Sequence, residues 1–131
     1  MLSSWNHVLV YAPATGNPSL LVKLRELIAA LDPLESVESC GSLNGLGERL
    51  RQPRGRPGVI VLLPGSREDI LDLLSMASLF DGLRLVVALP DRDADTVTKG
   101  YALGPRFLTY SDGGLADIAA VIEKMCNGAR I

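Results

Sequence analysis

Short apolar runs and longer amphipathic segments alternate along this chain. The apolar runs are rich in β-branched side chains and end at a proline or a polar turn, as buried strands do. The segments between them repeat leucine, isoleucine or alanine at spacings of three and four, which is the period of one helix face. The pattern predicts strands at 7–12, 36–40, 59–64, 84–89 and 106–110. It predicts helices at 18–31, 43–52, 67–81, 93–103 and 115–125.

Several helix boundaries carry their own local signals. Asn17 is a good N-cap, and Pro18 suits the first helical position because its missing N–H would have no partner there. Ser66 is placed to cap the third long helix, with acidic residues in the first turn where they meet the helix dipole. Gly82 is the expected C-terminal stop of that helix.

Strict alternation of strand and helix predicts a parallel sheet, because each helix returns the chain to the same edge. Right-handed crossovers then place helices on both faces. We expect a single α/β domain over residues 1–131: a flavodoxin-like (βα)5 doubly wound parallel sheet in three layers, with strand order 2-1-3-4-5. This order puts a functional crevice beyond the carboxyl ends of the strands, at the loops 12–19, 64–67, 89–93 and 111–114.

Composition narrows the classes of function. The chain has 131 residues, of which 47% are hydrophobic, yet no apolar run approaches the roughly 20 residues that span a membrane. The N-terminus lacks a basic region before its first strand, so we expect no secretory signal and a cytoplasmic protein without a membrane partner. A net charge of −2 argues against direct nucleic-acid binding, which needs excess cations. Cys40 and Cys126 belong to no C-x-x-C pair and are interpreted as separate thiols.

The layout of the five units resembles the receiver domains of two-component response regulators. The likeness is strongest in "RLVVALPDRDADTVTKGYALGPRFLTYSDGGLADIAAVIEKM", with Gly104 before the fifth strand. The resemblance implies phosphorylation of an aspartate at the end of the third strand and a magnesium ion held by an acidic pair at the end of the first. It also implies a threonine or serine after the fourth strand and a lysine after the fifth.

None of these motif positions is kept. The expected strand ends are Tyr11–Ala12, Leu63–Pro64, Ala88–Leu89 and Tyr110–Ser111. Aspartyl-phosphate chemistry needs a carboxylate nucleophile and a divalent cation held by oxygen ligands. We therefore expect a degenerate receiver: a signalling or regulatory interaction module with no catalytic residues, no metal site and no cofactor.

The first loop supports an alternative of a different class. "ATGNPS" is similar to the phosphate loop of flavodoxins, which would make Thr15, Gly16, Asn17 and Ser19 the ligands of FMN or of another phosphate. Pro13 and Pro18 occupy the two flanking hydroxyl positions, and proline has no N–H to donate. A structural turn before a capped helix competes with this interpretation.

A protein partner, with a second copy of this chain as one candidate, is the expected binding target. In receivers the usual dimer surface is the fourth helix, fifth strand and fifth helix, and by resemblance Lys99, Tyr101 and Tyr110 would lie near it. The helix at 67–81 is a rival surface, since its apolar arc is wider than packing on one sheet requires.

Other chemically suggestive residues have structural interpretations. Asp91, Asp93 and Asp95 lack the further oxygens of a calcium loop and are interpreted as the N-cap region of the fourth helix. His7, the single histidine, begins the first strand away from the crevice and has no visible catalytic partner. Ser66 follows a strand but lacks the G-x-S-x-G context, so capping is preferred.

Overall fold

The structure, a computed structural model, describes residues 7–16, 18–30, 36–52 and 57–128. In these residues five parallel strands form one sheet in the order β2-β1-β3-β4-β5. The strands are β1 (His7–Tyr11), β2 (Ser36–Cys40), β3 (Val59–Leu62), β4 (Arg84–Leu89) and β5 (Phe107–Tyr110). The helices are α1 (Pro18–Ala29), α2 (Leu43–Arg51), α3 (Arg67–Leu74), the 3₁₀ helix η2 (Ala77–Phe80), α4 (Ala94–Ala102) and α5 (Leu115–Gly128).

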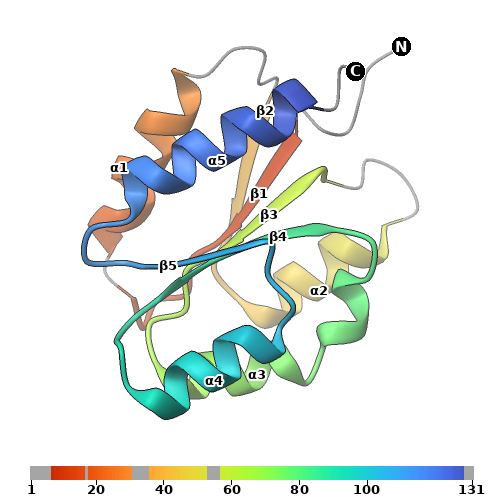
Figure 1. Cartoon of the computed structure of the whole chain (residues 1–131). Coiled ribbons are helices and arrows are strands. Elements are labelled where there is room, and N and C mark those ends of the chain that lie inside the picture. Colours follow the sequence, from red (N-terminus) through yellow and green to blue (C-terminus); the bar gives the residue numbers. More distant parts are fainter. Residues whose placement is uncertain (1–6, 17, 31–35, 53–56, 129–131) are drawn as a thin grey trace.

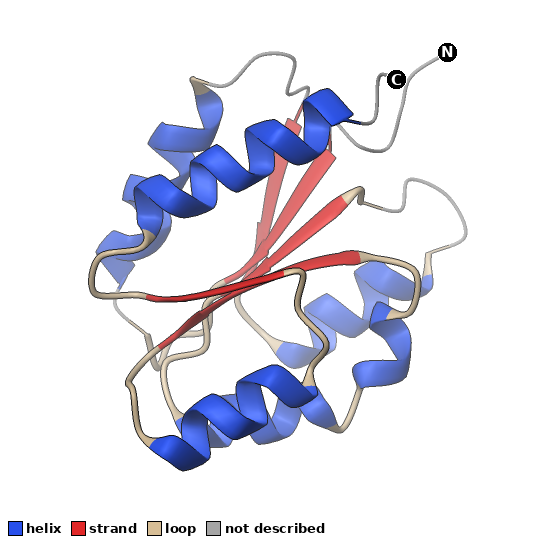
Figure 2. Ribbon diagram, in the orientation of Figure 1, coloured by secondary structure: helices blue, strands red, loops and turns tan. Residues whose placement is uncertain are grey.

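The sheet lies between two layers of helices (Figures 1 and 2). α1 and α5 cover one face, and α2, α3 and α4 cover the other. Alternate residues of β1 point to opposite faces: Val8 and Val10 pack with α1 and α5, whereas Leu9 and Tyr11 join the core on the other side. Every residue of β3 is buried, as expected of a central strand covered on both faces. The predicted three-layer, flavodoxin-like fold with strand order 2-1-3-4-5 is confirmed.

The helix starts follow the local signals only in part. α1 begins at Pro18 as predicted, while the expected cap Asn17 lies outside the described residues. Ser66 caps α3, because its hydroxyl oxygen accepts the Asp69 N–H at 3.3 Å. The acidic loop before α4 differs from the expectation: Asp93 occupies the N-cap position without a side-chain capping bond. Asp91 instead accepts the Asp93 N–H at 3.0 Å and so forms a turn of its own.

The single helix predicted over 67–81 is wrong, because α3 ends at Leu74 and η2 follows. The Ser75 hydroxyl donates to the Asp72 carbonyl at 2.5 Å, and the Met76 N–H donates to the Leu73 carbonyl at 3.1 Å. Such local bonds tighten the last turn into 3₁₀ geometry. Gly82 then turns the chain with φ of 78°, a conformation that favours glycine.

Candidate functional site

Apolar side chains end β1 and β3, the two neighbouring strands between which the strand order reverses. We call the loops 12–16, 63–66, 90–93 and 111–114 the carboxyl-end rim. Tyr11 closes β1 and is 3% exposed, Leu62 closes β3 and is fully buried, and Leu63, directly after β3, is also buried. Burial, followed by the nearby charge of Asp69, raises the pKa of Tyr11 to about 12, so its phenol stays neutral. The centre of the rim therefore carries no ionised group from β1 or β3.

The two loops that flank this centre pack against each other through their backbones. The Leu63 N–H donates to the Tyr11 carbonyl at 2.9 Å, and the Gly16 N–H closes a turn onto the Pro13 carbonyl at 3.1 Å. A Cβ placed on Gly65 would lie 2.5 Å from the Gly16 nitrogen, which is well inside van der Waals contact. Only a glycine allows this approach, and the approach closes the space between the loops.

Asp69 joins the same two loops from the first turn of α3. Its carboxylate accepts the Gly65 N–H at 2.8 Å and a hydrogen bond from the Thr15 hydroxyl. Only 9% of Asp69 is exposed, so this carboxylate is a buried structural acceptor. Sequence reasoning assigned it to the helix dipole and missed its partners. Ser66 and Asp69 have the S-x-x-D spacing that is typical of a capping box, in which the second side chain bonds to backbone at the start of the helix. This spacing could have indicated that Asp69 contacts the loop before α3.

The residues of the flavodoxin-like alternative do not act together. Thr15 and Gly16 lie in the loop contact just described, and Asn17 lies outside the described residues. Ser19 lies on α1 and lines a separate hollow against the β5–α5 loop. A phosphate at Thr15 would compete for its hydroxyl with the carboxylate of Asp69, a group of the same charge.

A second loop contact joins the far part of the rim. Arg92, after β4, donates two hydrogen bonds to Asp112, after β5, one of them at 3.0 Å. These bonds hold the pKa of Asp112 below its usual range. The Arg92 guanidinium also lies 4.2 Å from the centre of the Tyr110 ring, in cation–π contact.

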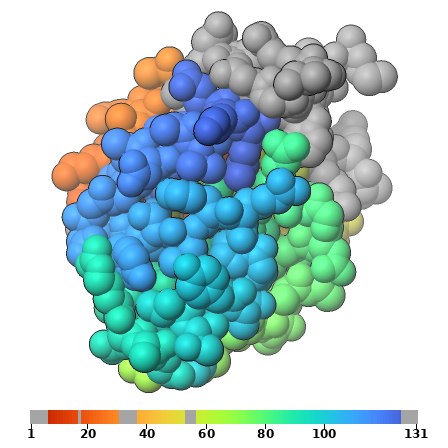
Figure 3. Space-filling view, in the orientation of Figure 1, coloured from red at the N-terminus to blue at the C-terminus, as the bar shows by residue number. Residues whose placement is uncertain are grey.

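The predicted interaction residues therefore differ in availability. Tyr110 is half-buried beneath Arg92, and the Lys99 ammonium is paired with the Asp95 carboxylate at 2.6 Å. Tyr101 is 62% exposed. The space-filling view shows α4, β5 and α5 as one continuous face of the molecule (Figure 3). On the rival surface, most apolar residues of α3 and η2 pack into or against the core, and Leu71 is 45% exposed.

An ionic cluster that sequence reasoning missed lies at the opposite, amino end of the sheet. Arg49 of α2 binds both carboxylate oxygens of Glu38 of β2 at 2.9 Å, and His7 of β1 contacts the same carboxylate. The hydrogen bonds from Arg49 lower the pKa of Glu38. His7 thus has partners, which became visible only once β1 and β2 were aligned in register.

Two properties of the described part of the chain complete the description of the site. It holds no group of three or more His, Cys, Asp or Glu side chains placed to share a metal ion. Nor does it include a helix with the length and apolar character that a membrane crossing requires.

Comparison of the sequence with protein-family models gives no match, and comparison with curated proteins gives none either. Solved structures do resemble the fold. The phosphorylated cyanobacterial phytochrome response regulator RcpA superposes with a TM-score of 0.64 at 17% identity, over 90% of this chain and 89% of that one. A putative pilus assembly-related protein from Burkholderia pseudomallei gives a TM-score of 0.64 at 14% identity, over 96% and 95% of the two chains.

The Mn²⁺-bound form of the response regulator Rcp1 is also similar, with a TM-score of 0.56 at 18% identity over 90% of each chain. At identities this low, what is shared is the fold. The predicted receiver-like fold is confirmed by its similarity to the two response regulators, and the chemistry of the rim has to be argued from this chain's own residues.

Proposed function

We propose that this chain is a receiver-like interaction module of a signalling or regulatory system, and that it works without aspartyl phosphorylation. The observation that carries the proposal is the composition and packing of the carboxyl-end rim. Tyr11 and Leu62 end the two strands that would have to supply the metal ligands and the nucleophile. The leucine side chain has no atom that can bind a divalent cation or accept a phosphoryl group, and the buried, neutral phenol of Tyr11 is a poor substitute for a carboxylate in either role.

Asp69 is the buried carboxylate near this part of the rim, and its position does not suit it to replace the missing aspartate. It belongs to α3, and it is held by the Gly65 N–H and the Thr15 hydroxyl. Both bonds go to one oxygen, Oδ2, and fix the carboxylate between two loops that are in backbone contact at Gly65; with only 9% of Asp69 exposed, a phosphoryl donor has little access to it. The geometry thus favours a structural role for Asp69 over a nucleophilic one.

The similar structures supply a contrast. RcpA was solved phosphorylated and Rcp1 with Mn²⁺ bound, and this chain shares their fold. The rim of this chain is apolar at β1 and β3. We therefore infer that the chain has the receiver-like fold and acts by binding a partner through its surface. The face formed by α4, β5 and α5, with Tyr101 exposed on it, is the surface that we assign to a protein partner or to a second copy of the chain.

Phosphoacceptor chemistry gives the direct test. The purified chain is incubated with acetyl phosphate and Mg²⁺ and then measured by intact-mass spectrometry, with RcpA treated in parallel as the positive control. We expect a phosphoryl adduct on RcpA and none on this chain. A Mg²⁺-dependent, hydroxylamine-sensitive adduct on this chain would contradict the proposal.

Pilus assembly is a second candidate setting for the same module. The observation in its favour is the similarity to the pilus assembly-related protein, which extends over more of both chains than the similarity to RcpA. Affinity capture from the native cell distinguishes the settings by the identity of the proteins recovered. Components of a pilus machine would favour assembly, whereas a sensor kinase or output domain would favour signal transduction.

A further inference from the structure

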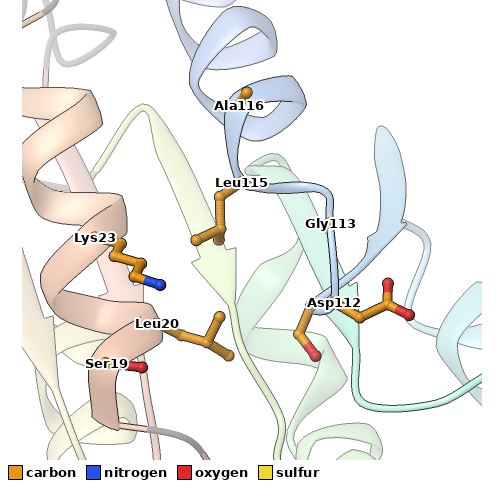
Figure 4. Close-up of a pocket in the computed structure, with 8 residues that line it drawn as sticks. Ser19, Leu20, Lys23, Asp112, Gly113, Leu115 and Ala116 are labelled. Carbon is orange, nitrogen blue, oxygen red and sulfur yellow. The ribbon is translucent and has the colours of Figure 1, made fainter.

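A shallow cavity of about 360 Å³ opens beside the rim, between α1 and the β5–α5 loop (Figure 4). One wall comes from the first turns of α1, with Ser19, Leu20 and Lys23. The opposite wall comes from Ser111, Asp112 and the start of α5. The cavity is separate from the contact between Thr15 and Asp69, and neither the fold nor the proposed interaction role explains it.

The charge that faces this cavity is positive. Figure 4 shows the Lys23 side chain extending from α1 toward Leu115, with its ammonium group between the two walls. The carboxylate of Asp112 points away from the cavity and is held by Arg92 on its far side. Among the ion pairs within the described ranges, none includes Lys23.

The remaining lining supplies a further hydrogen-bond donor and a small apolar contact. Ser111 contributes a hydroxyl from the wall opposite Lys23. Figure 4 shows the side chains of Leu20, on α1, and Leu115, at the start of α5, on the two sides of the cavity. One ammonium and one hydroxyl, contributed from two separate segments, can bind the terminal oxygens of a phosphate monoester. The volume lies near the lower end of the range for small-molecule sites, which limits the ester group to a compact one.

We propose that this cavity binds a small phosphate monoester without reacting with it. Lys23 supplies the balancing charge, the Ser111 hydroxyl donates to a phosphate oxygen, and Leu20 and Leu115 contact the ester group. The site differs from the loop-centred alternative suggested by "ATGNPS", because the Thr15 hydroxyl is held by Asp69 and takes no part. The proposal does not rest on the interaction function, because it is argued from the residues that line this cavity alone.

Titration of the full ¹⁵N-labelled chain with phenyl phosphate, followed by amide chemical shifts, tests the site. Phenol and inorganic phosphate separate the contributions of the ring and the anion, and sodium chloride serves as the control for ionic strength. We expect saturable shifts confined to residues 19–23 and 111–116. Lys23→Gln should weaken binding about threefold to fivefold, as expected for loss of one partly exposed ion pair.

Lys124→Gln is the matched control, because Lys124 is an exposed lysine on α5 that does not line the cavity. We expect it to bind phenyl phosphate as the unaltered chain does, and Ser111→Ala to bind more weakly. Equal losses of affinity in the two lysine variants would mean that general surface charge causes the binding, and this result would overturn the proposal. Shifts centred on residues 12–16, or no saturable shifts at millimolar phenyl phosphate, would also overturn it.

Discussion

The hydroxyl of Thr15 donates a hydrogen bond to the carboxylate of Asp69, although 54 positions separate the two residues in the sequence. This bond ties the loop after β1 to the first turn of the helix after β3. Asp69 also accepts the Gly65 N–H, so one buried carboxylate fixes both loops at the position where the chain reverses its strand order. At the centre of the rim, the loop after β1 and the loop after β3 are therefore packed tightly against each other.

Removal of this carboxylate should destabilise the fold. Asp69→Ala leaves the partly buried Gly65 N–H without its acceptor, and we expect the free energy of unfolding to fall by about 1–3 kcal/mol. Urea denaturation followed by circular dichroism measures the change. Asp72→Ala, at an exposed acidic position of the same helix, is the control and should stay within about 0.5 kcal/mol of the unaltered chain. Equal losses in the two variants would refute the structural role of Asp69.

The backbone contact at Gly65 should be equally intolerant of a side chain. In Gly65→Ala the new Cβ would meet the backbone of Thr15 and Gly16 at about 2.5 Å, so the loops must separate. We expect a loss of about 1–3 kcal/mol, which is typical of overpacking. Gly113→Ala is the control, because its Cβ would have no neighbour within 4 Å. Denaturation midpoints that coincide for the two variants would argue against the closed rim.

The elements could be predicted from local sequence, whereas their junctions could not. Buried strands such as β3 can be recognised in the sequence by their consecutive β-branched and aliphatic residues. The alternation of strand and helix then leaves few possible topologies. The end of α3 before Ser75 was not predicted, because the spacing of apolar residues favours a continuous helix over 67–81. The hydrogen bond from the Ser75 hydroxyl to the backbone competes with that helix. The bond between Thr15 and Asp69 and the cluster around Glu38 depend on register and loop packing, which no local pattern encodes.

The ionic cluster at the amino end of the sheet predicts a pH-dependent contribution to stability. Arg49 lowers the pKa of Glu38 below its usual 4.5, so the folded chain holds the ionised carboxylate more strongly than the unfolded chain does. The contribution is fully present above the unfolded pKa and is lost as the pH falls through the folded pKa. We expect Glu38→Gln to be less stable than the unaltered chain at neutral pH, with a difference that shrinks below about pH 4.5.

Unfolding free energies measured by urea denaturation between neutral and acidic pH provide the comparison. Glu48→Gln, at an exposed position of α2, is the control for the loss of a carboxylate and should stay within about 0.5 kcal/mol of the unaltered chain at neutral pH. A deficit in Glu38→Gln that keeps the same size throughout would mean that the ionisation of Glu38 is not what stabilises the fold.

The thiol of Cys40 should react more slowly than an ordinary exposed cysteine thiol. Burial, followed by the charge of Glu38, raises the pKa of Cys40 to about 11, so the reactive thiolate is scarce near neutral pH. In a Cys126→Ser background we expect iodoacetamide to modify native Cys40 at pH 8 on the order of 100-fold more slowly than an ordinary thiol. The rate should rise as the pH approaches 11, and urea should restore ordinary reactivity. Rapid labelling of the native chain at pH 8 would disprove the shielding.

Tyr101 offers the sharpest test of the interaction surface. Because its side chain is 62% exposed, Tyr101→Ser should leave the free energy of unfolding within about 0.5 kcal/mol of the unaltered value. If α4 contributes the contact with a second copy, sedimentation velocity will show concentration-dependent association of the unaltered chain and its loss in Tyr101→Ser. Leu71→Ser, at the exposed apolar position of α3, is the matched variant and should still associate. The opposite pattern would move the interface to α3, and a chain that sediments as a monomer at every concentration would leave a different protein as the partner.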